Sequence, residues 1–155
     1  MKIKKNNKIT FDPESKESVQ EVLEYLIEHD LLTGMNLGGA DLSYANFRNT
    51  NFCEANFEGA SLVWARLRGA DLFGSDLRGS VLEGADLEHA RLEGANFKGA
   101  SFEDADLSYA KLKRVNLEGA EFWSPRLERV EAFSEWADLP GSELEYLIIT
   151  RRKEE

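Results

Sequence analysis

A period of five residues runs through most of this chain of 155 residues. Every fifth residue from Leu37 to Leu127 is Leu or Phe, which makes 19 consecutive centres. A second column lies two residues before the centres, from Met35 to Pro125, and holds 13 Ala and three Ser or Thr. Five matches neither the period of an α-helix nor that of a β-strand. The chain must therefore turn once per unit and present one large and one small residue inward each time.

The repeating units, such as ADLSY, ANFRN and ADLFG, resemble the A-[D/N]-[L/F]-X-X motif of the pentapeptide-repeat family over residues 35–129. The resemblance implies a right-handed quadrilateral β-helix, an all-β solenoid in which four units form one square coil, so that the chain has about 4.75 coils. Stacked coils would pair their backbone groups with each other and enclose the Leu and Phe column. Gly stands two residues after the centre in nine units. Because a type II turn needs a positive φ there, we expect type II turns at the corners.

The flanks of the repeat supply candidate caps for the ends of the stack, and they divide the chain into an N-terminal tail and capping helix (1–34), the coils (35–129), and a C-terminal cap and tail (130–155). Val19, Val22, Leu23, Leu26 and Ile27 have the spacing of an amphipathic helix. With Asp12 and Pro13 as start signals, we predict this helix over residues 14–29. Residues 2–11 fit either a short edge strand or a basic tail.

At the C-terminal end, Phe133, Trp136 and Leu139 predict a segment that folds over the last coil. A capping-box pattern and a one-sided apolar stripe follow, and they predict a short helix over residues 143–149. Tyr146 and Ile149 lie off this stripe. They either complete the cap or form a dimer contact, since the resemblance includes members that pair through C-terminal helices. We expect a monomer or a C-terminal homodimer.

Residues 20 apart should stack on one face of such coils. One face carries Asn or Asp before each centre, which predicts a ladder of side-chain amides: Asn36, Asn56, Asp76, Asn96 and Asn116. The same spacing predicts ion pairs between coils, each worth little on an exposed surface: Arg66 with Asp86, Arg68 with Glu88, Glu58 with Arg78, and Lys98 with Glu118.

Composition and the missing motifs disfavour several classes of function. The net charge of −10 disfavours direct binding to nucleic acid or to an anionic membrane. A single Cys53 cannot form an intramolecular disulfide. With no secretory signal and no apolar run long enough to span a membrane, we expect a soluble cytoplasmic protein. His29 and His89 lack metal-ligand spacing, Cys53 is expected to be an ordinary exposed thiol, and no phosphate-binding or nucleophile-elbow motif occurs. We therefore expect a non-enzymatic protein without a cofactor or a bound metal.

The candidate partner site lies on the face centred on Leu42, Leu62, Leu82, Phe102 and Phe122. It combines aromatic and aliphatic residues that point outward with an acidic stretch that has no outward basic residue, and its predicted partner-binding residues are Tyr44, Val63, Trp64, Val81, Glu83, Glu103, Asp104 and Glu121. Phe73 and Trp123 are assigned no role. The alternative is that the N-terminal helix or the basic tail covers the aromatic residues.

Two main functional interpretations follow. The first is a protein–protein interaction module or scaffold that presents a rigid β-helical surface to an unidentified protein partner. The second comes from the resemblance, which implies a DNA-mimicking inhibitor or protector of a type II topoisomerase, DNA gyrase or topoisomerase IV, as in fluoroquinolone resistance. The repeats carry 11 Lys and Arg against 15 Asp and Glu, a net charge of only −4, which weakens that interpretation. A third possibility, end-to-end assembly, is disfavoured by the two predicted caps.

Overall fold

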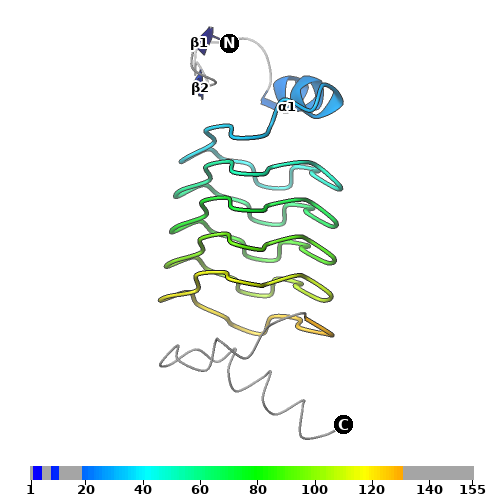
Figure 1. Cartoon of the computed structure of the whole chain (residues 1–155), viewed down its shortest axis with the longest axis vertical. Coiled ribbons are helices and arrows are strands. Elements are labelled where there is room, and N and C mark those ends of the chain that lie inside the picture. The colour runs from blue at the N-terminus through cyan, green and yellow to red at the C-terminus, as the bar shows by residue number, and fades with distance from the viewer. Residues whose placement is uncertain (1, 5–7, 11–18, 131–155) are drawn as a thin grey trace, which may run out of the picture.

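The computed structural model describes residues 2–4, 8–10 and 19–130. Its main body is a right-handed quadrilateral β-helix, seen from the side in Figure 1 as a stack of similar coils. Parallel bridges join residues 20 apart, from Asn36↔Asn56 to Asp106↔Arg126. Four five-residue units therefore complete one coil, and equivalent residues of successive coils lie one above the other.

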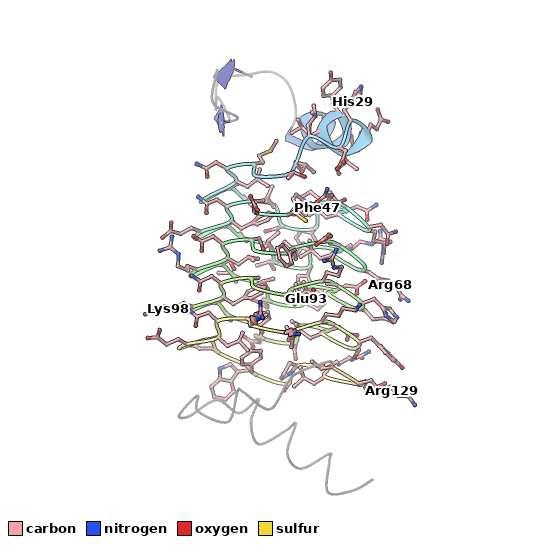
Figure 2. The ribbon with its side chains drawn as sticks, in the orientation of Figure 1. His29, Phe47, Arg68, Glu93, Lys98 and Arg129 are labelled. Atoms are coloured by element: carbon pink, nitrogen blue, oxygen red, sulfur yellow. The ribbon has the colours of Figure 1, made fainter. Side chains whose placement is uncertain are left out.

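The core is built from the two columns that the repeat predicts. Every Leu or Phe centre from Leu37 to Phe122 is buried, and most of the small column is buried with it. The rings of Phe47, Phe52 and Phe57 pack edge to face at centroid distances of 5.0 Å, and Phe47 lies inside the coils in Figure 2. Because a buried Leu or Phe side chain contributes about 1.5–3 kcal/mol, this continuous column is the main source of stability.

The corners are type II turns, as the glycine pattern predicts. At the first corner of the repeat the amide of Ala40 donates to the carbonyl of Leu37, with an N–O distance of 3.1 Å. The residue two after the centre has a positive φ at every corner from Gly39 to Arg129. Gly adopts this conformation without strain, whereas Tyr44 (φ 63°) and Trp64 (φ 55°) adopt it at a cost of roughly 1–2 kcal/mol each. Bulky residues at these corners are therefore held by the fold against their own preference.

Hydrogen bonds between coils pair the backbone along the whole stack. The amide of Leu37 donates to the carbonyl of Asn56 at 2.7 Å, and the amide of Asn56 donates to the carbonyl of Met35 at 2.8 Å. This pairing satisfies backbone groups that burial would otherwise leave unpartnered.

The predicted amide ladder is largely wrong. Among the described residues, one amide–amide bond joins adjacent coils, from Asn56 Nδ2 to Asn36 Oδ1 at 3.1 Å. The side chains of this column instead accept from the amide two residues later, as when Gly38 N donates to Asn36 Oδ1 at 3.0 Å. An Asp or Asn before the centre thus satisfies a turn amide, which explains the second position of the motif.

The N-terminal flank contains helix α1, Val19–Glu28, and strands β1, Lys2–Lys4, and β2, Lys8–Thr10. The two strands pair antiparallel, with Ile3 opposite Ile9. Helix α1 lies across the N-terminal end of the coils in Figure 1, and its Leu26 is buried in the same cluster as Leu32 and Leu37. The helix therefore covers the apolar end of the stack.

Part of both predicted caps falls outside the described residues. The described helix lies within the predicted range 14–29, of which residues 14–18 are outside. The predicted C-terminal segment with Phe133, Trp136 and Leu139, the helix over 143–149, and the dimer contact at Tyr146 and Ile149 also lie outside the described residues.

Candidate functional site

The structure brings the eight predicted partner-binding residues together on one side of the rod. The bridges Asp41↔Ser61, Ser61↔Val81, Val81↔Ser101 and Ser101↔Glu121 align the coils of this side in register. We call it the aromatic–acidic face. It consists of the outward residues around the centres Leu42, Leu62, Leu82, Phe102 and Phe122: Asp41, Ser43, Tyr44, Ser61, Val63, Trp64, Val81, Glu83, Gly84, Ser101, Glu103, Asp104, Glu121, Trp123 and Ser124.

The N-terminal half of the aromatic–acidic face carries exposed apolar side chains. The side chain of Tyr44 is 72% exposed and that of Trp64 is 50% exposed, while Val81 is exposed and Val63 is half-buried. Their backbones are fixed by the coil ladder, since Tyr44 N donates to the carbonyl of Val63 at 2.8 Å. Helix α1 therefore leaves Tyr44 and Trp64 exposed. The alternative that the basic tail covers them falls mostly on residues outside the described part of the chain.

Trp64 is held in place by a glycine of the next coil. A Cβ atom added to Gly84 would lie 2.5–2.6 Å from three atoms of the Trp64 indole. The indole therefore packs directly against Gly84, which also has a φ of 63°. Glycine is needed at this corner both for the turn and for the approach of the ring. One side of the indole is buried against the coil, and the rest of the side chain is available to a partner.

The C-terminal half of the face carries four of its five carboxylates. Glu83, Glu103, Asp104 and Glu121 are exposed. Within the described residues none of them forms an ion pair with Lys or Arg. At the other end of the face, hydrogen bonds from the hydroxyl and amide of Ser43 lower the pKa of Asp41 and favour its charged form.

Charge is distributed unevenly among the four sides of the rod. The aromatic–acidic face has five carboxylates and no Lys or Arg, whereas the other three faces share ten carboxylates and all eleven Lys and Arg of the coils. Eight of those ten carboxylates form ion pairs with Lys or Arg. The net charge of −4 is therefore the sum of one strongly acidic side and three nearly neutral sides.

Three of the four predicted ion pairs between coils are confirmed. Lys98 Nζ lies 2.9 Å from Glu118, Arg78 lies 3.1 Å from Glu58, and Arg68 pairs with Glu88. Arg68 and Lys98 project from opposite sides of the rod in Figure 2. These pairs lie on faces other than the aromatic–acidic face.

The predicted pair of Arg66 with Asp86 is wrong. Asp86 accepts from the amide of Glu88, which turns its carboxylate toward the corner of the coil. There it meets the guanidinium of Arg48, two coils away, at 3.3 Å. Stacking of residues 20 apart fixes the backbone bridge between Arg66 and Asp86 but not the direction of their side chains.

Cys53, predicted to be exposed, is half-buried on the opposite side of the rod. Burial and a hydrogen bond with Asp71 raise the pKa of its thiol. Since the thiolate is the reactive form, this environment makes Cys53 a weak nucleophile. Close by, Phe73 is 45% exposed and lies 5.9 Å from the Arg91 guanidinium.

Sequence analysis assigned Trp123 no role, although it lies on the aromatic–acidic face. Its side chain is 62% exposed, and its carbonyl accepts from the amide of Asp104 at 2.8 Å. The signal was present in the sequence, because Trp123 lies 20 residues after Glu103 and 60 after Val63. It was assigned no role because it lies far along the face from Tyr44 and Trp64.

The two histidines make local contacts. His29 Nδ1 lies 2.8 Å from the carbonyl of Tyr25, and their rings stack at 4.1 Å. His89 stacks on Tyr109 at 4.7 Å and lies 3.3 Å from Glu88. Within residues 2–4, 8–10 and 19–130, no three His, Cys, Asp or Glu side chains are grouped so that they could hold a metal ion. The same part of the chain has no helix of the length and apolar character that a membrane crossing requires.

Solved structures similar to this chain are themselves pentapeptide repeat proteins. Rfr23 from the cyanobacterium Cyanothece 51142 is 34% identical with a TM-score of 0.60, and the match covers 61% of this chain and 65% of Rfr23, just under two thirds of that protein. A protein from the thylakoid lumen of Arabidopsis thaliana is 23% identical with a TM-score of 0.53, over 78% of each chain, and shows the fold alone.

Full-length QnrB1, a plasmid-mediated fluoroquinolone resistance protein, is 18% identical with a TM-score of 0.46, over 77% of this chain and 85% of QnrB1. A likeness this distant carries no argument about function. Comparison with curated proteins gives no significant match. The model of the family described as pentapeptide repeats matches residues 36–72, 65–104 and 85–123. Because these segments together cover more than half of the sequence, the chain belongs to the pentapeptide-repeat family.

Proposed function

We propose that this chain is a non-enzymatic protein-binding module whose contact surface is the aromatic–acidic face. The observation that carries the proposal is the concentration of exposed apolar side chains on one side. Of the six large hydrophobic residues exposed on the coils, four lie on this face: Tyr44, Trp64, Val81 and Trp123. Exposed aromatic residues grouped on a polar surface are typical of protein interfaces. Pentapeptide repeat proteins are generally non-enzymatic structural or interaction modules, which agrees with this function.

Recognition on this surface requires little rearrangement. The coils are fixed by backbone hydrogen bonds at every level, and the indole of Trp64 is already packed against Gly84. A pre-ordered surface loses little conformational entropy on binding, so more of the contact energy appears as affinity. The exposed carboxylates of this face add selectivity and accelerate encounter with a basic partner.

Capture of a partner from cell extract is expected to depend on Trp64. With the full chain as bait, Trp64→Asp should reduce the amount of the main captured protein at least tenfold, because loss of a central aromatic anchor costs about 2 kcal/mol or more. Asp tolerates the positive φ of this corner, so the coil is retained. Phe73→Asp, on the opposite side, is the matched control and should capture as the unchanged chain does. Equal losses for both variants would contradict the assignment of the face.

Inhibition or protection of a type II topoisomerase, DNA gyrase or topoisomerase IV, is the second candidate function. It is favoured by one observation, the row of carboxylates on the aromatic–acidic face that form no ion pair among the described residues. This row resembles a row of phosphates more closely than the net charge of the coils suggests.

A gyrase supercoiling assay, with and without a fluoroquinolone, tests this second candidate. Inhibition or drug protection at micromolar protein should be lost in Glu103→Lys/Asp104→Lys, which reverses the charge of the acidic half. Glu58→Lys/Glu118→Lys makes the same change of charge on the neighbouring face and should keep the effect. No effect of the unchanged chain would exclude gyrase as the target and leave the protein-binding module.

A further inference from the structure

The composition of the aromatic–acidic face changes along the rod. Tyr44 and Trp64 lie on the N-terminal coils, whereas four of the five carboxylates, all except Asp41, lie on later coils together with Trp123. Trp64, Gly84 and Asp104 occupy the same corner of three successive coils. Since neighbouring strands lie about 4.8 Å apart, Trp64 and Asp104 are separated by about 10 Å along the axis. A partner that contacts both Trp64 and Asp104 must therefore present two different kinds of side chain about 10 Å apart.

The chemistry required at the acidic end is cationic. Glu103, Asp104 and Glu121 form no ion pair within the described residues, and the face contributes no Lys or Arg of its own. The contrast with the other faces is direct, since Lys98 and Arg78 there neutralise Glu118 and Glu58. A partner that brings Lys or Arg would therefore gain contacts without having to break an ion pair within this described face.

The chemistry required at the other end is apolar. Trp64 presents the unpacked part of its indole, and Tyr44 lies one coil above it at the same corner. Both residues stand at corners with a positive φ and keep much of their aromatic surface exposed, which an apolar side chain of a partner could cover.

We propose that the aromatic–acidic face binds a basic, extended segment of a partner protein. An apolar side chain of this segment packs on Trp64 and Tyr44, and Lys or Arg residues about three positions further along reach Glu103, Asp104 and Glu121, since three residues of extended chain span about 10 Å. The proposal rests on the proposed protein-binding function and adds to it the chemistry and the direction of the ligand.

Fluorescence anisotropy with defined peptides tests the proposal. The probe is a fluorescein-labelled peptide of twelve residues with two Leu followed, three positions later, by a run of Lys and Arg. It should bind the full-length protein with a Kd in the micromolar range at low salt. Replacing the Leu pair by Ser, or the Lys and Arg by Gln, should each weaken binding at least tenfold. Binding that depends only on the charge of the peptide overturns the proposal.

Variants of the protein separate an anchored complex from simple attraction of charges. Trp64→Asp should weaken binding of the probe at least tenfold although it adds a negative charge, whereas attraction of charges alone predicts tighter binding. Glu103→Gln/Asp104→Asn should also weaken binding at least tenfold. Glu58→Gln/Glu118→Gln removes the same charge from the neighbouring face and should leave the Kd unchanged. If neither Trp64→Asp nor Glu103→Gln/Asp104→Asn changes the Kd, the proposal is overturned.

Two further outcomes separate a failure of the peptide proposal from a failure of the protein-binding function. If capture from extract depends on Trp64 but no peptide binds, the protein-binding function stands and the basic segment is excluded as its ligand. If no peptide binds and the full chain self-associates in sedimentation experiments in a manner that Trp64→Asp abolishes, the ligand is a second copy of this chain, which also overturns the proposal.

Discussion

Replacing Phe52 by Ala is expected to lower the free energy of unfolding by about 3–5 kcal/mol, the range typical of Phe→Ala in a packed core. Phe52 is fully buried and packs edge to face against Phe47 and Phe57, both at 5.0 Å. Its removal leaves a cavity between consecutive corners of the coil, where the backbone ladder prevents collapse. Chemical denaturation followed by far-UV circular dichroism measures the loss.

Phe73→Ala is the control for this change, because it removes the same side chain from the surface. Phe73 is 45% exposed and lies two residues before the small column rather than in the core. Its replacement should cost less than about 1 kcal/mol. A loss below about 1 kcal/mol for Phe52→Ala, or equal losses for the two variants, would contradict the assignment of Phe52 to the core column.

The fold was predictable because a single pattern determines almost every contact in the coils. Leu37 and its equivalents fill the core, the small column allows the corners to close, and residues 20 apart meet by necessity. The type II corners followed from the same pattern, since the glycines mark the position that needs a positive φ. Periodicity thus fixes the backbone before any particular side-chain contact is considered.

Side-chain direction was less predictable, because the period specifies which residues are stacked but not which atoms meet. Asp86 lies beside Arg66 in the bridge and nevertheless pairs with Arg48. All five residues of the predicted ladder accept from the amide of their own turn, and within the described residues only Asn36 and Asn56 also bond to each other. In both cases the backbone amide two residues later binds a side-chain oxygen and sets the direction of the side chain.

The sequence predicted which residues form the candidate face, but it underestimated how acidic that face is. Its eight residues follow from the 20-residue spacing, and the structure places them together. The sequence argument against an acidic surface used the charge of all coils, −4, and so averaged the aromatic–acidic face with three faces on which eight carboxylates form ion pairs. An electrostatic field depends on where the charges lie, so the distribution among faces matters more than their sum.

Replacing Gly84 by Ala is expected to lower the free energy of unfolding by about 2–4 kcal/mol, of which roughly 1–2 kcal/mol comes from the left-handed corner and the rest from the collision with Trp64. The added Cβ would lie 2.5–2.6 Å from three indole atoms. Gly79→Ala is the matched control, because Gly79 has a φ of 62° and nothing within 4 Å of the added atom. Gly79→Ala should lower the free energy of unfolding only by the roughly 1–2 kcal/mol that the left-handed corner costs.

A double-mutant cycle separates the two parts. In a Trp64→Ala background the indole is absent, so Gly84→Ala and Gly79→Ala should become equally costly, and the difference between them in the unchanged chain measures the packing of Trp64 on Gly84. If Gly84→Ala costs no more than Gly79→Ala while Trp64 is present, the indole swings away freely and is not a fixed anchor. Because the rigidity of this ring underlies the expected entropic advantage in partner binding, the same variant should also weaken the complex, although Gly84 itself has no side chain with which to contact a partner.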